Sequence, residues 1–262
     1  MKKYSLFIFS LAIMAFFACS NPKKESEGFV LTRIENSDTI VLDADATDSP
    51  VLDVNISLYE VTLPDIEATG NITNAIANAI LEKDAADITT VCNEYINCAK
   101  AEYFENKPDY TAQKEKGEEY FWFNHTKEIS SEVESGYKKY ISYVLYFYEF
   151  EGGAHPSSWT KVLNFDATDG KEIVLDDIMK EGYTDILIPL IEAGIARYFE
   201  VETMADVIEN AFLFQEDIYV PQNFILSKDK ITFIYNRYEI APYAAGEITV
   251  EIPYTDIEEI LR

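Results

Sequence analysis

The chain has 262 residues, of which 47 are acidic and 21 are lysine or arginine, so its formal net charge at pH 7 is −26. Such a surface repels nucleic acid and anionic lipid and attracts basic proteins, so nucleic acid is excluded as a partner. Hydrophobic residues make up 48% of the chain, enough for one large domain or two closely packed lobes.

The N-terminus resembles a secretory signal, because Lys2 and Lys3 precede an apolar run, 6–18, that is too short to span a bilayer comfortably. Cys19 follows in a setting that resembles a lipobox, and 19–28 form a polar tether. We predict cleavage before Cys19, a lipid on its thiol, and an exported protein anchored to a membrane of the cell envelope, on its periplasmic or surface face. An ordinary signal peptide that contains a cysteine is the alternative. Removing 1–18 removes two lysines, which gives a mature net charge of −26 − 2 = −28.

Residues 29–117 are predicted to form an N-terminal lobe of strands and two helices. Residues 29–34 and 39–42 favour a small hairpin that turns at 36–38. The acidic loop 43–50 is spaced like a calcium loop, but it lacks the central glycine and the final glutamate. The sequence therefore predicts a solvated loop and no metal site.

Val51–Leu63 alternates apolar and polar residues, which predicts a strand. Apolar residues at helical spacing predict one helix that begins after Asn71, its candidate N-cap, and a second helix over 88–103. Residues 107–117 end the helical lobe. Cys92 and Cys98 lie about 9 Å apart on a continuous helix, too far for a disulfide without a break, so free thiols are favoured over a bond that an export compartment would permit.

Residues 118–262 are predicted to form a C-terminal lobe. Its strongest β signal is a hairpin of Tyr120–Val133 and Tyr137–Phe150, whose second strand has apolar residues on both faces and is therefore expected to be covered on both sides. A helix over 188–199 has Pro189 in its first turn. The other predicted strands are 159–165, 171–175, 224–226, 231–235 and 247–252, and short helices are predicted at 176–179 and 256–261. The fold class is α+β: a helix pair followed by a mostly antiparallel twisted sheet with helices packed on it.

The sequence offers little for catalysis. Its only histidines are His125, on an apolar strand face, and His155, in a glycine-rich bend. No nucleophile motif, phosphate loop or metal-ligand spacing accompanies them, and the 47 acidic residues make chance carboxylate pairs inevitable. We therefore expect no catalytic residue, metal or cofactor, with a glycoside hydrolase as the alternative.

Three stretches carry a family resemblance. Tyr148–His155 with the turn region 164–178, and the tail 238–253, resemble the RsiV-like extracytoplasmic domain. Val51–Asn106 resembles the PdaC-type module that accompanies it. The resemblance implies an α+β domain outside the cytoplasmic membrane, which in one member is the lysozyme-binding sensor of an anti-sigma factor and in another lies beside a peptidoglycan deacetylase domain. This sequence lacks the sigma-binding segment, the transmembrane helix and the deacetylase metal ligands, so neither activity carries over.

The candidate binding residues are Gly152, Gly153, His155, Trp159, Tyr238 and Tyr243. The glycine pair allows the chain to leave a strand sharply and to expose His155; alternatively, it only ends the strand while His155 caps a turn. The resemblance and the charge together favour an envelope lipoprotein that binds a basic protein such as a lysozyme. Binding of peptidoglycan through tyrosine and tryptophan rings is the first alternative, and an envelope hydrolase is the second.

Overall fold

The computed structural model describes residues 24–26, 28–210, 212–214 and 218–262. The predicted signal and the lipidation residue Cys19 lie outside these ranges. Within them, no helix has both the length and the apolar character needed to cross a membrane.

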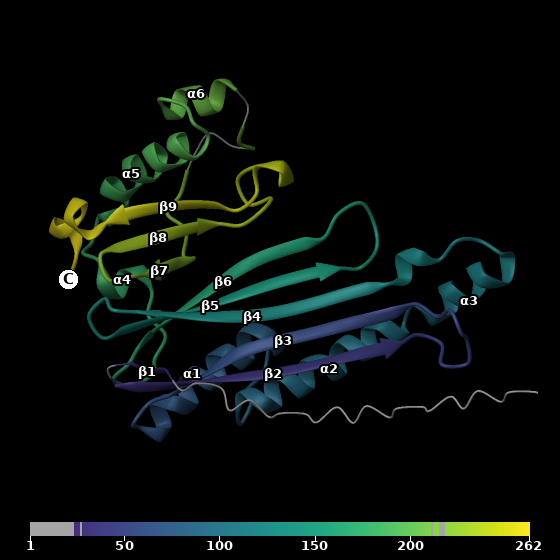
Figure 1. The fold of residues 1–262 in the computed structure, drawn as a ribbon. Helices are drawn as coiled ribbons and strands as arrows, with labels where there is room; N and C mark the ends of the chain where they lie inside the picture. Colours follow the sequence, from purple (N-terminus) through teal and green to yellow (C-terminus); the bar gives the residue numbers. More distant parts are fainter. Residues whose placement is uncertain (1–23, 27, 211, 215–217) are drawn as a thin grey trace, which may run out of the picture.

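The largest element is a six-stranded sheet whose strands lie side by side in chain order (Figure 1). Neighbouring strands are antiparallel, except that β3 and β4 are parallel. The strands are β1 (Lys24–Ser26), β2 (Phe29–Val41), β3 (Val51–Thr62), β4 (His125–Ser135), β5 (Tyr140–Phe150) and β6 (Ser157–Asp166). A parallel pair requires a crossover connection, and the helical segment between β3 and β4 provides it.

That segment contains α1 (Ile66–Leu81), α2 (Ile88–Phe104), α3 (Lys107–Lys116) and the 3₁₀ turn η1 (Phe121–Phe123). Helices α1 and α2 cover one face of the large sheet, where alternate residues of the strands form the first core. Leu52, Val54, Ile56 and Leu58 of β3 all point into this core and are at most 3% exposed. The two-residue alternation of a strand therefore places the intervening polar residues on the opposite face.

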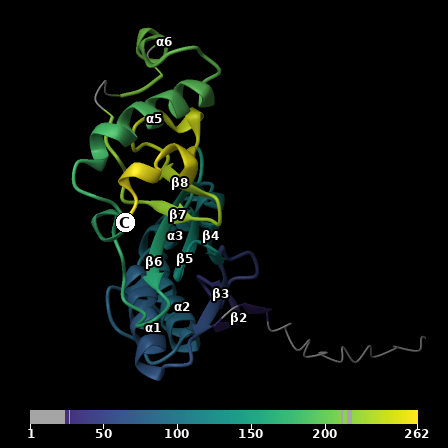
Figure 2. The same ribbon diagram turned by 90° about the vertical axis from the view of Figure 1, so that its left-hand side faces the viewer.

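A three-stranded antiparallel sheet of β7 (Phe224–Leu226), β8 (Lys230–Tyr235) and β9 (Ile248–Pro253) forms the centre of the second core. Helix α5 (Tyr183–Tyr198) packs on β9, where Gly194 allows the close approach: a Cβ atom there would lie 2.3 Å from Val250 Cγ1. Shorter elements complete the lobe: α4 (Leu175–Ile178), α6 (Met204–Glu209), η2 (Tyr243–Ala245), η3 (Tyr254–Asp256) and η4 (Glu258–Ile260). Figure 2 shows the resulting layers, with α1 and α2, the large sheet, the small sheet and α5 following one another.

The α+β class is confirmed, with a mostly antiparallel sheet and helices packed on it. The boundary expected near residue 117 falls between β3 and β4, which pair within one sheet. Within the described residues there are nevertheless two large hydrophobic cores, one around α1 and α2 and one around α5, and a small third cluster of Val144, Val162 and Ile234.

Several predicted boundaries were wrong. The hairpin at 29–42 is one continuous strand, β2, because β3 pairs with it at every position from Val30 to Val41. Helix α1 begins earlier than predicted, with Asp65 as its N-cap; Asn71 lies inside the helix and donates its side-chain amide to Asp169 O at 2.9 Å. Residues 107–116 form a helix because Pro108 occupies the first turn, where no amide donor is needed.

Three further differences concern the C-terminal half. Pro189 lies in the middle of α5, not in its first turn. Residues 171–175 contribute only a single bridge, between Phe165 and Glu172, before α4 begins. The end of the chain forms two 3₁₀ turns, η3 and η4, where one short helix over 256–261 was predicted. Short polar segments of this kind depend on tertiary contacts that periodicity does not reveal.

Candidate functional site

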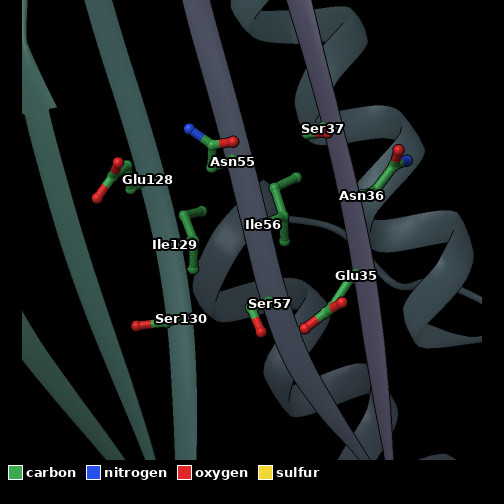
Figure 3. A pocket seen from close by; sticks show the side chains of 9 residues that line it. All are labelled: Glu35, Asn36, Ser37, Asn55, Ile56, Ser57, Glu128, Ile129 and Ser130. Carbon is green, nitrogen blue, oxygen red and sulfur yellow. The ribbon is translucent and has the colours of Figure 1, made fainter. Parts of the chain in front are cut away.

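The face of the large sheet that points away from α1 and α2 is polar, and we call it the outer face. Over β2, β3 and β4 it encloses a shallow pocket of about 570 Å³ (Figure 3). The pairing register of β2, β3 and β4 explains which residues line this pocket. Asn55 lies beside Ser37 and Glu128, and Ser57 lies beside Glu35 and Ser130. This part of the outer face therefore consists of hydroxyl, amide and carboxylate groups.

The outer face continues into a second pocket of about 410 Å³, which lies between the large sheet and the loop before β9. We call it the outer groove. It shares Glu128 and Ser130 with the first pocket, so the two are continuous. Its other principal residues are Tyr146 and Tyr148 on β5, Ser158 and Thr160 on β6, and Arg237 and Glu247 from the second lobe. The groove is thus formed where the two sheets meet.

Tyr146 lies at the centre of a field of carboxylates. Its hydroxyl donates to Glu132 Oε2 at 3.3 Å, and burial together with Glu132 and Glu247 raises its pKa to about 12. Glu247 Oε2 accepts a hydrogen bond from Thr160 Oγ1 at 2.5 Å. Within the described residues, Glu128, Glu132 and Glu247 form no ion pair with a lysine, arginine or histidine. The region therefore holds three uncompensated carboxylates around two half-exposed tyrosines.

Arg237 is the cation on the groove wall, and it is already engaged. Its Nη1 donates to Ser158 Oγ at 2.7 Å, and its guanidinium carbon lies 5.0 Å from the centre of the Tyr243 ring. Its Nε is buried without a hydrogen-bond acceptor among the described atoms. Arg237 therefore fixes the position of the β8–β9 loop against β6.

The structure brings three predicted binding residues together beside this groove. The His155 ring stacks on Tyr243, with centroids 4.1 Å apart, and its Nε2 lies 3.4 Å from the Tyr238 hydroxyl. His155 and Tyr238 are exposed, and Tyr238 adopts a φ of 64°, which is unusual for a residue with a side chain. We call these three residues the loop cluster; it joins the β5–β6 loop to the β8–β9 loop.

The remaining candidates have other positions. Gly152 has a φ of 79°, and a Cβ atom there would lie 2.3 Å from Trp122 O, so the glycine fixes the root of the β5–β6 loop. Gly153 has a φ of 106° and open space around it. Trp159 stacks on Phe147, with centroids 4.7 Å apart, and strand alternation directs both rings toward the helix-covered face. Both residues also line the outer groove, and the ring partner of Trp159 among the described residues is Phe147 and not a member of the loop cluster.

Neither histidine contacts a serine, threonine or cysteine side chain that it could activate as a nucleophile, among the contacts of the described residues. His155 contacts Tyr238 and its own neighbour Pro156, and His125 packs against Tyr103 in the core, where burial lowers its pKa. No group of three or more potential metal ligands was found in the described ranges. The arrangement can bind through charge, hydroxyl groups and aromatic rings.

Of the residues that line the outer groove, only Trp159 was a candidate from the sequence. Tyr146 and Tyr148 occur two positions apart, which places them on one face of a strand, but the apolar residues on that face led to the prediction that it is covered. Arg237 and Glu247 reach the groove only through the packing of the second lobe.

Two family models match the chain. Residues 53–158 match the family described as "Deacetylase PdaC", and residues 176–255 match "Protein of unknown function (DUF3298)". Each model covers less than half of the chain, so one part of the chain is similar to each family. The resemblance found in the sequence is thereby confirmed for both parts. The outer groove lies where the two regions meet, since β4 and β5 belong to the PdaC-type region and Arg237 and Glu247 belong to the DUF3298 region.

A crystal structure of a DUF3298 family member from Bacteroides fragilis superposes with a TM-score of 0.81 at 27% identity, covering 91% of this chain and 96% of that one. A DUF3298 protein from Pseudomonas aeruginosa shares the fold, with a TM-score of 0.59 at 18% identity over 88% of this chain and 94% of that one. The curated relatives match over less than half of this chain, which spans half or less of their own length. An esterase of Mycobacterium tuberculosis is 29% identical over 44% of this chain and 50% of its own length. The peptidoglycan-N-acetylmuramic acid deacetylase PdaC of Bacillus subtilis is 26% identical over 48% of this chain and 27% of its own length.

Proposed function

We propose that the protein is a non-catalytic binding module of the bacterial cell envelope, held by a lipid on Cys19, that receives a basic segment of a partner protein in the outer groove. A lysozyme-like protein is a partner of the required charge. The observation that carries the proposal is the set of carboxylates at Glu128 and Glu247 in the groove and at Glu132 beside it, none of which forms an ion pair with a described lysine, arginine or histidine. A lysine or arginine side chain entering the groove would form ion pairs with these carboxylates.

The negative net charge of the chain also favours a basic partner, because its electrostatic field accelerates the approach of a basic protein. The field alone would not select a site. The hydrogen bonds of Glu132 to Tyr146 and of Glu247 to Thr160 hold two of the carboxylates in fixed orientations. Fixed acceptors at the meeting point of two sheets provide a defined position for a cationic side chain.

The test replaces Glu128, Glu132 and Glu247 with glutamine and measures the affinity for egg-white lysozyme by calorimetry. We expect a loss of about tenfold or more, since a charge pair at such a site contributes on the order of 1–2 kcal/mol. The control changes Glu202, Glu209 and Glu258 to glutamine; these residues are exposed on the second lobe, and the change in net charge is the same. An equal loss in the control, or the absence of binding at about 0.01 M salt, would contradict the groove as the site.

A second candidate is binding of a peptidoglycan glycan strand, favoured by the exposed pair Tyr146 and Tyr148. Their rings lie on the outer face with Ser130 and Ser158 as neighbours across the strands, and tyrosine rings beside hydroxyl groups suit stacking on sugars. The name of the Bacillus subtilis relative refers to peptidoglycan. Retention on purified sacculi that resists salt and is lost in Tyr146→Ala/Tyr148→Ala, with Phe121→Ala as the exposed aromatic control, would favour this candidate over the first.

The names of these two curated relatives, an esterase and a deacetylase, are the reason to test the hydrolase alternative. A hydrolase predicts turnover that a single carboxylate change abolishes. Assays with p-nitrophenyl acetate and with acetylated muropeptides, comparing the parent chain with Glu247→Gln, separate turnover from binding. Reproducible turnover that this change eliminates would overturn the non-catalytic assignment.

A further inference from the structure

The outer groove contains two cross-strand rows of side chains, each with a tyrosine at its centre. Strand register places each tyrosine of β5 between one residue of β4 and one residue of β6. The first row consists of Glu128, Tyr148 and Ser158, and the second of Ser130, Tyr146 and Thr160. Both tyrosines are more than one-third exposed. Each aromatic ring therefore has hydrogen-bonding groups on both sides and enough exposed surface for a ligand to contact.

A carboxylate lies beside each ring on the β4 side. Glu128 is the β4 neighbour of Tyr148, and Glu132 accepts a hydrogen bond from the hydroxyl of Tyr146 at 3.3 Å. Neither carboxylate forms an ion pair with a described lysine, arginine or histidine. A ligand that stacks on the rings and carries positive charge at its edge would satisfy both features at once.

The β6 side of the rows has a different charge. Arg237 donates to Ser158 there, and Glu247 accepts a hydrogen bond from Thr160. One positive and one negative group are therefore present on this side. The excess negative charge of the site lies along β4.

The site continues along β4 beyond the two rows. A hollow of about 290 Å³ adjoins the outer groove, lined by Glu132 and Glu134 on the large sheet and by Thr232 on the small sheet. Tyr146 lines both spaces, so they are continuous. From Glu128 to Glu134, β4 covers about 20 Å at about 3.3 Å per residue. The site is therefore long enough for a chain of several small units.

The β6 side of the groove is fixed by side chains of the second lobe. Asn236 bonds both the amide and the carbonyl of Thr160. Asn223 bonds Val162 N and Thr160 O. These bonds hold β6 and the second lobe in one arrangement, so little ordering of the groove is needed when a ligand binds.

A sugar ring combines the properties that the rows would recognise. Its C–H face stacks on an aromatic ring, and its hydroxyl groups form hydrogen bonds with serine and threonine. An N-acetylated amino sugar is neutral, whereas one with a free amine is cationic. The carboxylates beside both rings favour the cationic form.

We propose that the outer groove binds a glycan whose amino sugars carry free, protonated amines. Its sugar rings stack on Tyr146 and Tyr148. Its amines lie on the β4 side, beside Glu128 and Glu132. This inference rests on the glycan-binding candidate described above, names the chemical form of its ligand, and adds a salt-sensitive contact to the stacking.

The test compares three ligands by calorimetry at about pH 6, below the pKa of amino groups, and at about 0.01 M salt. They are the β-1,4-linked tetramer of glucosamine, its fully N-acetylated form, and tetralysine. The two sugars have the same rings and differ in charge, whereas tetralysine has the charge without the rings. We expect the glucosamine tetramer to bind about tenfold more tightly than the acetylated form.

Two variants separate stacking from charge. Tyr146→Ala/Tyr148→Ala should weaken binding of the glucosamine tetramer about tenfold, while Tyr146→Phe/Tyr148→Phe, which keeps both rings, should retain most of it. Circular dichroism verifies that both variants fold. Tetralysine should bind the alanine variant as well as it binds the parent chain, because its attraction depends on the carboxylates.

Equal binding of the two sugars would overturn the requirement for free amines and leave the glycan-binding candidate standing. No binding of the glucosamine tetramer, or binding that the alanine variant does not weaken, would overturn the proposal entirely. An equal loss of tetralysine binding in the alanine variant would show that the rings only maintain the shape of the groove, and would overturn it as well. The basic-segment function is tested separately, since it requires that tetralysine binding falls in Glu128→Gln/Glu132→Gln/Glu247→Gln.

Discussion

Asn236 holds the backbone of Thr160 with both ends of its side-chain amide. Thr160 N donates to Asn236 Oδ1 at 2.7 Å, and Asn236 Nδ2 donates to Thr160 O at 3.0 Å. The asparagine thus provides hydrogen-bond partners for the backbone N–H and C=O of Thr160 on the edge strand β6, as a neighbouring strand would. Because Thr160 also bonds Glu247 and Ser158 bonds Arg237, this contact fixes the wall of the outer groove relative to its floor.

We predict that Asn236→Ala and Asn223→Ala each lower the free energy of unfolding by about 1–3 kcal/mol, since each leaves backbone groups of β6 without partners. Denaturant unfolding followed by circular dichroism gives the value. Asn55→Ala removes an exposed amide from the same sheet and should change the free energy by no more than about 0.5 kcal/mol. Similar losses in all three variants would mean that the amide contacts at β6 have no special role.

The second prediction concerns the root of the loop that carries His155. In Gly152→Ala the new Cβ atom would meet Trp122 O, and the residue would keep a positive φ, so we expect destabilisation of about 1–3 kcal/mol. In Gly153→Ala the only source of destabilisation is the positive φ of the residue, because no atom lies within 4 Å of the added carbon. In thermal unfolding, the melting temperature of Gly152→Ala should be lower than that of Gly153→Ala. The reverse order would show that the loop relaxes away from Trp122.

The sequence was sufficient to predict elements whose side chains alternate over a long range. The two-residue alternation of the sequence places Ile141, Tyr143, Leu145 and Phe147 on one face of β5, and all four are buried there. The same rule predicted cover on the other face, which is correct for Val144 but not for Tyr146 and Tyr148, both of which are more than one-third exposed. Periodicity identifies a face, whereas the extent of the second lobe determines how much of that face is covered.

The site depended on information that local patterns do not contain. His155, Tyr238 and Tyr243 were selected from two separate motifs, and the fold brings them together. Lys127 was not selected, yet its ammonium lies within 3.6 Å of Glu102, Glu149 and Glu151 in a largely buried position. Such a group joins a helix to two strands, and only the packing of α2 on the sheet reveals it.

The third prediction concerns the two cysteines of α2, which the structure shows as free thiols. Burial raises the pKa of the Cys92 thiol to about 11, and Cys98 is exposed. Iodoacetamide at about pH 8 should therefore label Cys98 quickly and Cys92 only after unfolding, because the thiolate is the reactive form. Peptide mass spectrometry separates the two sites. Rapid labelling of Cys92 in the folded protein would show that α2 opens readily.

The fourth prediction concerns the dependence of stability on pH. His125 is 9% exposed, and burial lowers its pKa below the ordinary value of 6.5. The unfolded chain therefore takes up a proton at a higher pH than the folded chain does. The contribution of His125 to stability is fully present above pH 6.5 and is lost as the pH falls toward the lowered pKa of the folded state.

Denaturant unfolding at several pH values between about 7.5 and 5 measures this slope, which for one group is at most about 1.4 kcal/mol per pH unit. The variant His125→Phe keeps an aromatic ring against Tyr103 and removes the titrating group, so its stability should fall less over this interval. If His125→Phe and the parent chain lost stability in parallel, carboxylates would be responsible for the acid sensitivity, and the buried histidine would not.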